Sequence, residues 1–282
     1  MPQPPNVYRL KTIKRNLYII PSDNTSDDAL NIIIHRFNFE RLKRISIQLG
    51  AERKRVRLKL ESGKTLSERE NAFTDTNRVV RICKAEYYKD IRQYALFFTA
   101  LNFLEDAIRC AVNEIYYAKD RRDDWHKDIT LWPQWYYERV SDDQDKLARI
   151  LRVRYAANFL ENLDFGVLLG FLTSDTAWSS TNVPSLFASK KNISGASLPF
   201  LSQDELNKRL SIIQKFRNII YHHNIVPNPL RFRIDGHDIS IEATPNKILK
   251  NILDMLEYFD VNASNLIKEL SDRENEGYLT DQ

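Results

Sequence analysis

The residues with the clearest capacity for chemistry lie between Lys215 and Asn224, where an arginine, an asparagine and two adjacent histidines follow one another closely. A histidine exchanges a proton near neutral pH, and the planar guanidinium group of an arginine matches the oxygens of a phosphate. Arg217, Asn218 and His222 could therefore cleave RNA by acid–base chemistry that needs no metal ion.

A helix must position these side chains. Its expected start is a capping box at Ser202, with Glu205 three residues later. Apolar residues then recur at helical spacing, at Leu206, Leu210, Ile213 and Ile220. Arg217 falls on this stripe and is expected near the core or a dimer seam. Asn218 and His222 lie four residues apart and share another face. In the last turn, the helix dipole would favour the protonated histidine.

A second, longer helix is expected from about residue 85 to residue 117. Its apolar stripe has steps of three and four and comprises Tyr94, Phe98, Leu101, Ile108, Val112 and Ile115. Glu105 occupies one position of that stripe, where a carboxylate without a partner would be costly to bury. We therefore expect a basic partner, either Arg109 one turn along or Arg217 across the core. The alternative is an ordinary surface pair between Glu105 and Arg109.

The first third of the chain carries most of the positive charge. Residues 1–85 have a net charge of +9, whereas the remainder has a net charge of −5. The alternation in residues 45–49 and 55–60 predicts a β-hairpin turning at residues 50–54. With an extended segment over residues 7–20 and a helix over residues 27–44, this predicts a basic α+β module over residues 1–80. The hairpin's basic residues, Arg53, Arg55, Arg57 and Lys59, are RNA-binding candidates; alternatively they protect an exposed strand edge.

The rest of the chain predicts further helices and one hairpin. The expected elements are a helix over 144–161, a short apolar helix over 163–172, a loop or lid over 173–199, a hairpin over 231–241 turning at Asp235-Gly236, and a helix over 245–270. The aromatic residues of segment 125–137 are expected to cap the core rather than to stack on bases. The polar tail, 271–282, is expected to be frayed.

Composition narrows the class of protein. The chain has 282 residues, 43% of them hydrophobic, with 7 glycines and 2 cysteines. These values favour a soluble, mainly helical, cytoplasmic protein with no membrane span. Cys83 and Cys110 are isolated, and no ligand spacing indicates a zinc site. His35, His126 and His237 have no evident partners in the sequence. We expect no cofactor.

Three motifs together resemble the HEPN superfamily, and most closely its Abi-like branch from bacterial abortive-infection systems. Arg217 and His222 match the superfamily's arginine-to-histidine motif at the end of a helix. Glu105 and Arg109 match the Glu-x-x-x-Arg pair of an earlier long helix. The Asp164-Phe165-Gly166 segment matches a Phe-Gly turn before a short apolar helix. The resemblance covers about residues 85–270.

The resemblance implies a HEPN-type helical bundle over residues 81–270 that forms a homodimer, with the two motifs meeting at the dimer cleft. It implies a metal-independent endoribonuclease acting in phage defence or as a toxin. His222 would be the general base or acid, and Arg217 would hold the scissile phosphate. Asn218 would orient the imidazole or the substrate, and His223 would support the site, as would Glu105 and Arg109.

Two other functions remain open at this point. The same fold could be a non-catalytic scaffold that holds a guide or regulatory RNA. It could also be an interaction protein that binds an antitoxin protein or forms an oligomer.

Overall fold

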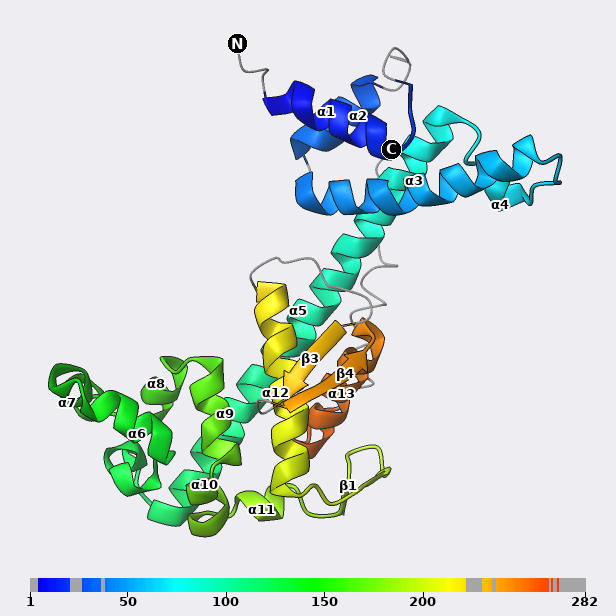
Figure 1. Ribbon diagram of the computed structural model, residues 1–282. Coiled ribbons are helices and arrows are strands. Elements are labelled where there is room, and N and C mark those ends of the chain that lie inside the picture. The colour runs from blue at the N-terminus through cyan, green and yellow to red at the C-terminus, as the bar shows by residue number, and fades with distance from the viewer. Residues whose placement is uncertain are drawn as a thin grey trace. The chain divides into compact units, whose positions relative to one another are not determined.

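A computed structural model describes residues 5–20, 27–36, 39–221, 230–234, 237–263, 265 and 268. Within these residues the protein is mainly helical, as predicted, with two small antiparallel ladders (Figure 1). The chain forms two compact units, Met1–Ala95 and Leu96–Gln282. The division falls within the long helix α5 (Thr76–Asp120). Among the described residues, no helix is both long enough and apolar enough to cross a membrane.

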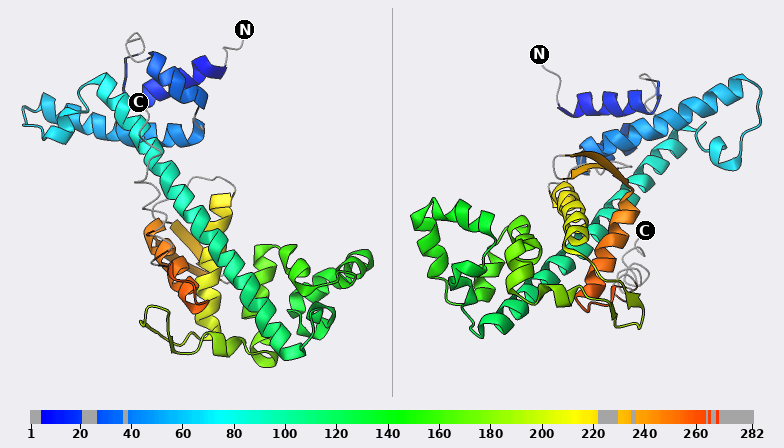
Figure 2. Two further views of the ribbon diagram at one scale, coloured as in Figure 1. Left: turned by 180° about the vertical axis from the view of Figure 1, so that it is seen from behind. Right: turned by 60° about the horizontal axis from the view of Figure 1, so that its bottom comes forward.

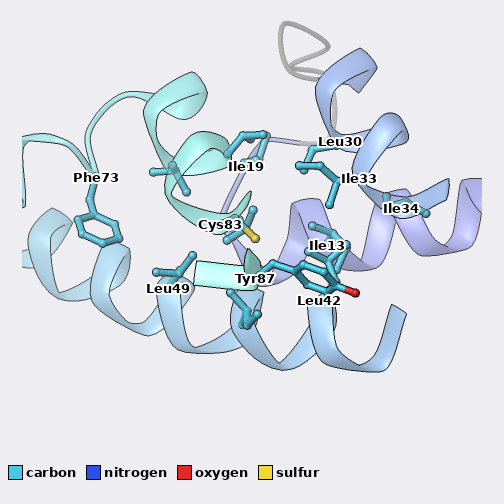
Figure 3. Packing of buried hydrophobic residues seen from close by; sticks show 14 of the residues in the cluster. Ile13, Ile19, Leu30, Ile33, Ile34, Leu42, Leu49, Phe73, Cys83 and Tyr87 are labelled. Carbon is cyan, nitrogen blue, oxygen red and sulfur yellow. The ribbon is translucent and has the colours of Figure 1, made fainter. Parts of the chain in front are cut away.

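The first unit is built from helices. They are α1 (Pro5–Asn16), α2 (Asp27–Arg36), α3 (Phe39–Glu61), α4 (Glu68–Asn71) and the first part of α5. Helix α1 packs against both α2 and α3. Figure 3 shows the apolar cluster between them, which includes Ile13, Leu30, Leu42 and Cys83. Burial raises the pKa of the Cys83 thiol to about 12.

The predicted α+β character of this unit was wrong. Residues 45–60 belong to α3 rather than to a hairpin, and most of the segment expected to be extended is α1. The reason lies in the spacing of Leu42, Ile45, Leu49 and Val56, which are buried along one helix face. The alternating residues Leu58 and Leu60 are instead 56% and 50% exposed. Arg, Lys and Leu are also good helix formers, so the alternation was a chance pattern.

Gly50 allows α1 and α3 to approach closely. A Cβ atom at this position would lie 1.8 Å from the backbone oxygen of Asn16. Gly50→Ala should therefore lower the free energy of unfolding by about 3 kcal/mol, because a backbone atom must move. Urea denaturation followed by circular dichroism measures the change. The exposed neighbour provides a control, since Ala51→Gly should cost only about 1 kcal/mol of helix propensity. A Gly50→Ala variant as stable as the wild type would contradict this account of the packing.

The second unit contains the remaining elements, which Figure 2 shows from two further sides. They are the rest of α5, the 3₁₀ turns η1 (Trp125–Lys127) and η2 (Ile129–Leu131), α6 (Gln134–Ser141), α7 (Gln144–Leu151), α8 (Ala156–Glu161), α9 (Phe165–Thr173), α10 (Asp175–Ser180), α11 (Val183–Leu186), β1 (Lys190–Lys191), β2 (Ser197–Leu198), α12 (Gln203–Tyr221), β3 (Leu230–Ile234), β4 (His237–Ala243) and α13 (Pro245–Tyr258).

Several predicted boundaries need correction in this unit. The helix expected over 144–161 is divided into α7 and α8, and the expected loop over 173–199 contains α10, α11 and the β1–β2 ladder. Helix α13 ends at Tyr258, well before residue 270, and Asp260 follows in the left-handed region at φ 58°. The antiparallel pairing of β3 with β4 confirms the predicted hairpin. Its expected turn, Asp235-Gly236, lies outside the described residues.

An aromatic cluster forms one core of this unit, as predicted for segment 125–137. The ring of Trp125 lies 4.6 Å from that of Tyr116 and 5.9 Å from that of Phe171. Trp125 and His126 are fully buried. The His126 ring stacks on Phe159 at 5.1 Å, and burial lowers the pKa of this histidine. His126 is therefore a core residue.

Helix α12 has the predicted capping box. The backbone N–H of Glu205 donates to Ser202 Oγ at 3.3 Å, and the N–H of Ser202 donates to Glu205 Oε2 at 3.1 Å. The predicted stripe of α12 is buried, together with Phe216, whose ring meets that of Phe97 edge-on at 5.0 Å. The helix packs against α9, α13 and β3. These contacts hold the C-terminal part of α12, where Arg217 directly precedes the last turn, in a defined position.

Candidate functional site

The centre of the site is a carboxylate shared by two arginines. Glu105 Oε1 accepts from Arg109 Nη2 at 2.6 Å, and Glu105 Oε2 accepts from Arg217 Nη2 at 3.1 Å. The side chains of Glu105, Arg109 and Arg217 are only 14%, 17% and 21% exposed, respectively. Both basic partners expected for Glu105 are therefore present at once. Glu105 joins α5 to α12.

Arg109 is fixed by more than Glu105. Its guanidinium also donates to the backbone oxygens of Leu160 and Leu163, the latter at 3.3 Å. These carbonyls lie at the end of α8 and in the turn before α9, where orphan acceptors need donors. Arg109 is therefore a structural tie between α5 and the α8–α9 connection.

Arg217 lies close to two aromatic rings. Its guanidinium carbon is 4.0 Å from the centre of the Tyr221 ring and 5.2 Å from that of Phe165. The hydroxyl of Tyr221 donates to Asn102 Oδ1, and desolvation, followed by the Glu105 charge, raises the pKa of Tyr221. Within the described part of the chain, the buried Nε of Arg217 has no hydrogen-bond acceptor.

A polar pocket of about 950 Å³ opens beside this cluster. Its lining comprises Glu105, Arg109, Trp135, Arg139, Glu161, Asn162, Leu163, Asp164, Phe165, Gly166, Val167, Gln214, Arg217 and Asn218. It thus brings together the Glu-x-x-x-Arg pair, the Phe-Gly turn and two residues of the α12 motif, which are far apart in the sequence. Asn218 is exposed at its rim, next to Arg217.

Two of the expected site residues, His222 and His223, lie outside the described residues. In the sequence they follow directly on Tyr221, the last residue of α12. In the described part of the chain, no three His, Cys, Asp or Glu side chains gather as they would around a metal ion.

The four basic candidates of the first unit have different surroundings. Arg53 donates to the Leu17 oxygen and to Thr76 Oγ1, each at 3.1 Å, and Lys59 pairs with Glu70. The Lys59 contact is the main reason that the pKa of Glu70 falls to about 2. Arg55 and Arg57 are exposed on α3. Arg53 and Lys59 thus make contacts within the unit, and RNA binding by any of the four stays a prediction.

Several residues that line the pocket were not predicted as site residues from the sequence. Gln214 lies three residues before Arg217 on the same face of α12, and helical spacing alone could have placed it there. Trp135 and Arg139 are four residues apart on α6, a helix that the sequence did not predict. Trp135 was grouped with the aromatic core, yet it is 44% exposed.

Comparison with models of protein families, with curated proteins and with solved structures finds no significant match to this chain.

Proposed function

We propose that this chain is a metal-independent endoribonuclease of the HEPN type, in which Arg217, Asn218 and His222 form one half of a site shared by two chains. The observation that carries the proposal is the place of Arg217. Its guanidinium group borders the polar pocket, five residues before His222 in the sequence. The residues Glu105 and Arg109 of the earlier helix support it there.

The charge of the cluster around Glu105 supports a role in binding phosphate, although the pocket lining as a whole, with three arginines and three carboxylates, is neutral. Arg109 and Arg217 carry two positive charges, and Glu105 neutralises one of them, so the cluster keeps a net positive charge. The fork of an arginine can donate two parallel hydrogen bonds to phosphate oxygens.

The proposed reaction balances without a cofactor. His222 removes the proton from a ribose 2′-hydroxyl, and the 2′-oxygen attacks the adjacent phosphorus. The bond from phosphorus to the 5′-oxygen breaks, and that oxygen takes a proton from the protonated histidine of the second chain. Arg217 stabilises the charge that builds on the phosphate oxygens. The products are a 2′,3′-cyclic phosphate and a 5′-hydroxyl end.

Such an activity fits a toxin or a phage-defence protein, because uncontrolled RNA cleavage stops growth. It would require control by a partner, either an antitoxin protein or a regulatory RNA.

One observation favours a second candidate function, a non-catalytic scaffold of the same fold that binds RNA or protein. Arg217 is paired with Glu105 and stacked on Tyr221, as an arginine with a purely structural role would be. In that case, the arginine would hold α12 against α5 and would not contact a reacting phosphate.

Replacing His222 distinguishes the two functions. His222→Ala should abolish cleavage of RNA and leave RNA binding within a few-fold of the wild type, because the change removes the proton-transfer group but no phosphate contact. Cleavage is followed on labelled RNA, and binding by filter retention at low salt, where phosphate contacts are strongest. His35→Ala, which removes a histidine of α2 that has no role in the proposed site, is the matched control and should cleave RNA at the wild-type rate. Unchanged cleavage by His222→Ala would exclude the proposed enzyme.

A further inference from the structure

The pocket beside Arg217 is larger than a phosphate group requires. Its volume of about 950 Å³ lies within the range of about 300–1,000 Å³ that small-molecule sites occupy. Residues of α12 and α5 line it near Arg217, and residues of α6, of the end of α8, of the α8–α9 connection and of the start of α9 complete the lining. The volume therefore leaves space for the base of a nucleotide whose phosphate contacts Arg217, in a pocket that α6 also lines.

Two aromatic side chains line the described pocket, and Trp135 of α6 is the exposed one, because Phe165 is buried. The chain has four tryptophans, and three of them donate their indole N–H to protein acceptors: Trp125 to Asn113, Trp132 to His126 and Trp178 to Leu172. Trp135 is 44% exposed and, within the described part of the chain, its indole N–H has no acceptor. An exposed indole that lines a polar pocket is a suitable stacking surface for a base.

Two glycines of α9 make room for side chains of this pocket. A Cβ atom at Gly166 would lie 2.4 Å from Gln214 Nε2, and one at Gly170 would lie 2.8 Å from Trp135 Cζ2. Glycine in a helix interior costs about 1 kcal/mol relative to alanine. The absence of both Cβ atoms on the same helix face thus lets the amide of Gln214 and the indole of Trp135 sit at the wall of the pocket.

The remaining polar groups favour a base edge that donates hydrogen bonds. Asp164 and Glu161 line the pocket and are exposed, and neither forms an ion pair with any described residue. Asp164 stands at the N-cap of α9 but makes no side-chain cap hydrogen bond, so its carboxylate oxygens are available. Carboxylates repel a phosphate backbone and accept hydrogen bonds from a base. The adjacent N1–H and N2 amino group of guanine present two such donors side by side.

We propose that this pocket binds a guanine base of the RNA next to the scissile phosphate. Trp135 stacks on the base, and the carboxylate of Asp164 accepts from its N1–H and N2 amino group. Arg139, the third arginine of the pocket, lies on α6 where it can contact a neighbouring phosphate. The link to cleavage rests on the proposed ribonuclease function, whereas the binding of guanine can be measured separately.

The test is a titration with guanosine, adenosine, cytidine and uridine 3′-monophosphates, followed by tryptophan fluorescence. The guanosine nucleotide should bind the wild type about 5- to 100-fold more tightly than the others, the discrimination expected for a bidentate contact to one base edge. Asp164→Asn should lose most of this preference, because an amide offers one acceptor in place of two. Trp135→Phe should remove the quenching signal and retain binding.

The exposed Glu138→Gln on α6, a carboxylate outside the pocket, is the matched control and should keep the preference. Equal binding of the four nucleotides, or an unchanged preference in a folded Asp164→Asn variant, would overturn the inference.

Cleavage of short RNAs that contain a single guanine separates this result from the nuclease proposal. Selective guanine binding without cleavage contradicts only the nuclease, and cleavage without base preference contradicts only the guanine site.

Discussion

Arg217→Ala is expected to reduce the rate of RNA cleavage by about 10²- to 10³-fold or more, the effect of removing one group that stabilises transition-state charge. Among the arginines and lysines that the structure describes, only Arg217 both lines the pocket and lies close to His222 in the sequence. Single-turnover cleavage of a labelled RNA measures the effect on the chemical step. Substrate binding should weaken far less than the rate, because the negative charge on the phosphate increases in the transition state.

Two further variants test whether the loss of cleavage rate is specific to the guanidinium group of Arg217. Arg217→Lys keeps the positive charge but loses the planar fork, and should recover only part of the activity. Arg149→Ala removes an exposed arginine of α7 that lies outside the pocket, and should cleave at the wild-type rate. If folded Arg217→Ala cleaved RNA as fast as the wild type, the role assigned to this residue would be wrong.

Glu105→Ala is expected to lower the free energy of unfolding by about 2–4 kcal/mol, somewhat less than for a fully buried ion pair because the side chains retain some exposure. The change leaves the guanidinium groups of Arg109 and Arg217 close together without their shared carboxylate. It also removes the side-chain link between α5 and α12. Urea denaturation of the purified variant measures the loss.

Glu114→Ala provides the matched control on the same helix. Glu114 is exposed and makes no ion pair with any described residue, so its loss should change stability by no more than about 0.5 kcal/mol. Glu105→Gln should fall between the two, because the amide can still accept from one arginine. Equal stability of Glu105→Ala and Glu114→Ala would show that the cluster contributes nothing to the fold.

The part of the fold with regular helical spacing could be predicted from the sequence. The predicted stripe of α5 is buried at Tyr94, Leu101, Ile108 and Val112, but Phe98, one of its predicted members, is 42% exposed. Glu105 meets both basic partners expected for it. The capping box at Ser202 and the β3–β4 pairing were also predicted, because each depends on residues close together in the chain.

Elements whose local pattern is ambiguous could not be predicted in this way. The alternation from Arg55 to Leu60 fits a strand, and only burial of Leu42, Ile45 and Leu49 against α1 shows why α3 is helical. Short apolar runs do not by themselves distinguish helix from strand.

The pocket could not be predicted because it is assembled from distant segments. Trp135 and Asp164 become neighbours of Arg217 only after α6, α9 and α12 have packed together. In the sequence, Gly166 and Gly170 look like ordinary residues of an apolar helix. Their role in making room for Gln214 and Trp135 appears only when the other helices are in place.

The most direct test of the central claim is the chemistry of the RNA ends that the purified protein produces in the presence of EDTA. Total RNA should be cleaved under these conditions, and the fragments should carry 2′,3′-cyclic phosphate and 5′-hydroxyl ends. Both products should disappear with His222→Ala and with Arg217→Ala. A requirement for a divalent metal ion, or fragments that carry 3′-hydroxyl ends, would contradict the proposed mechanism.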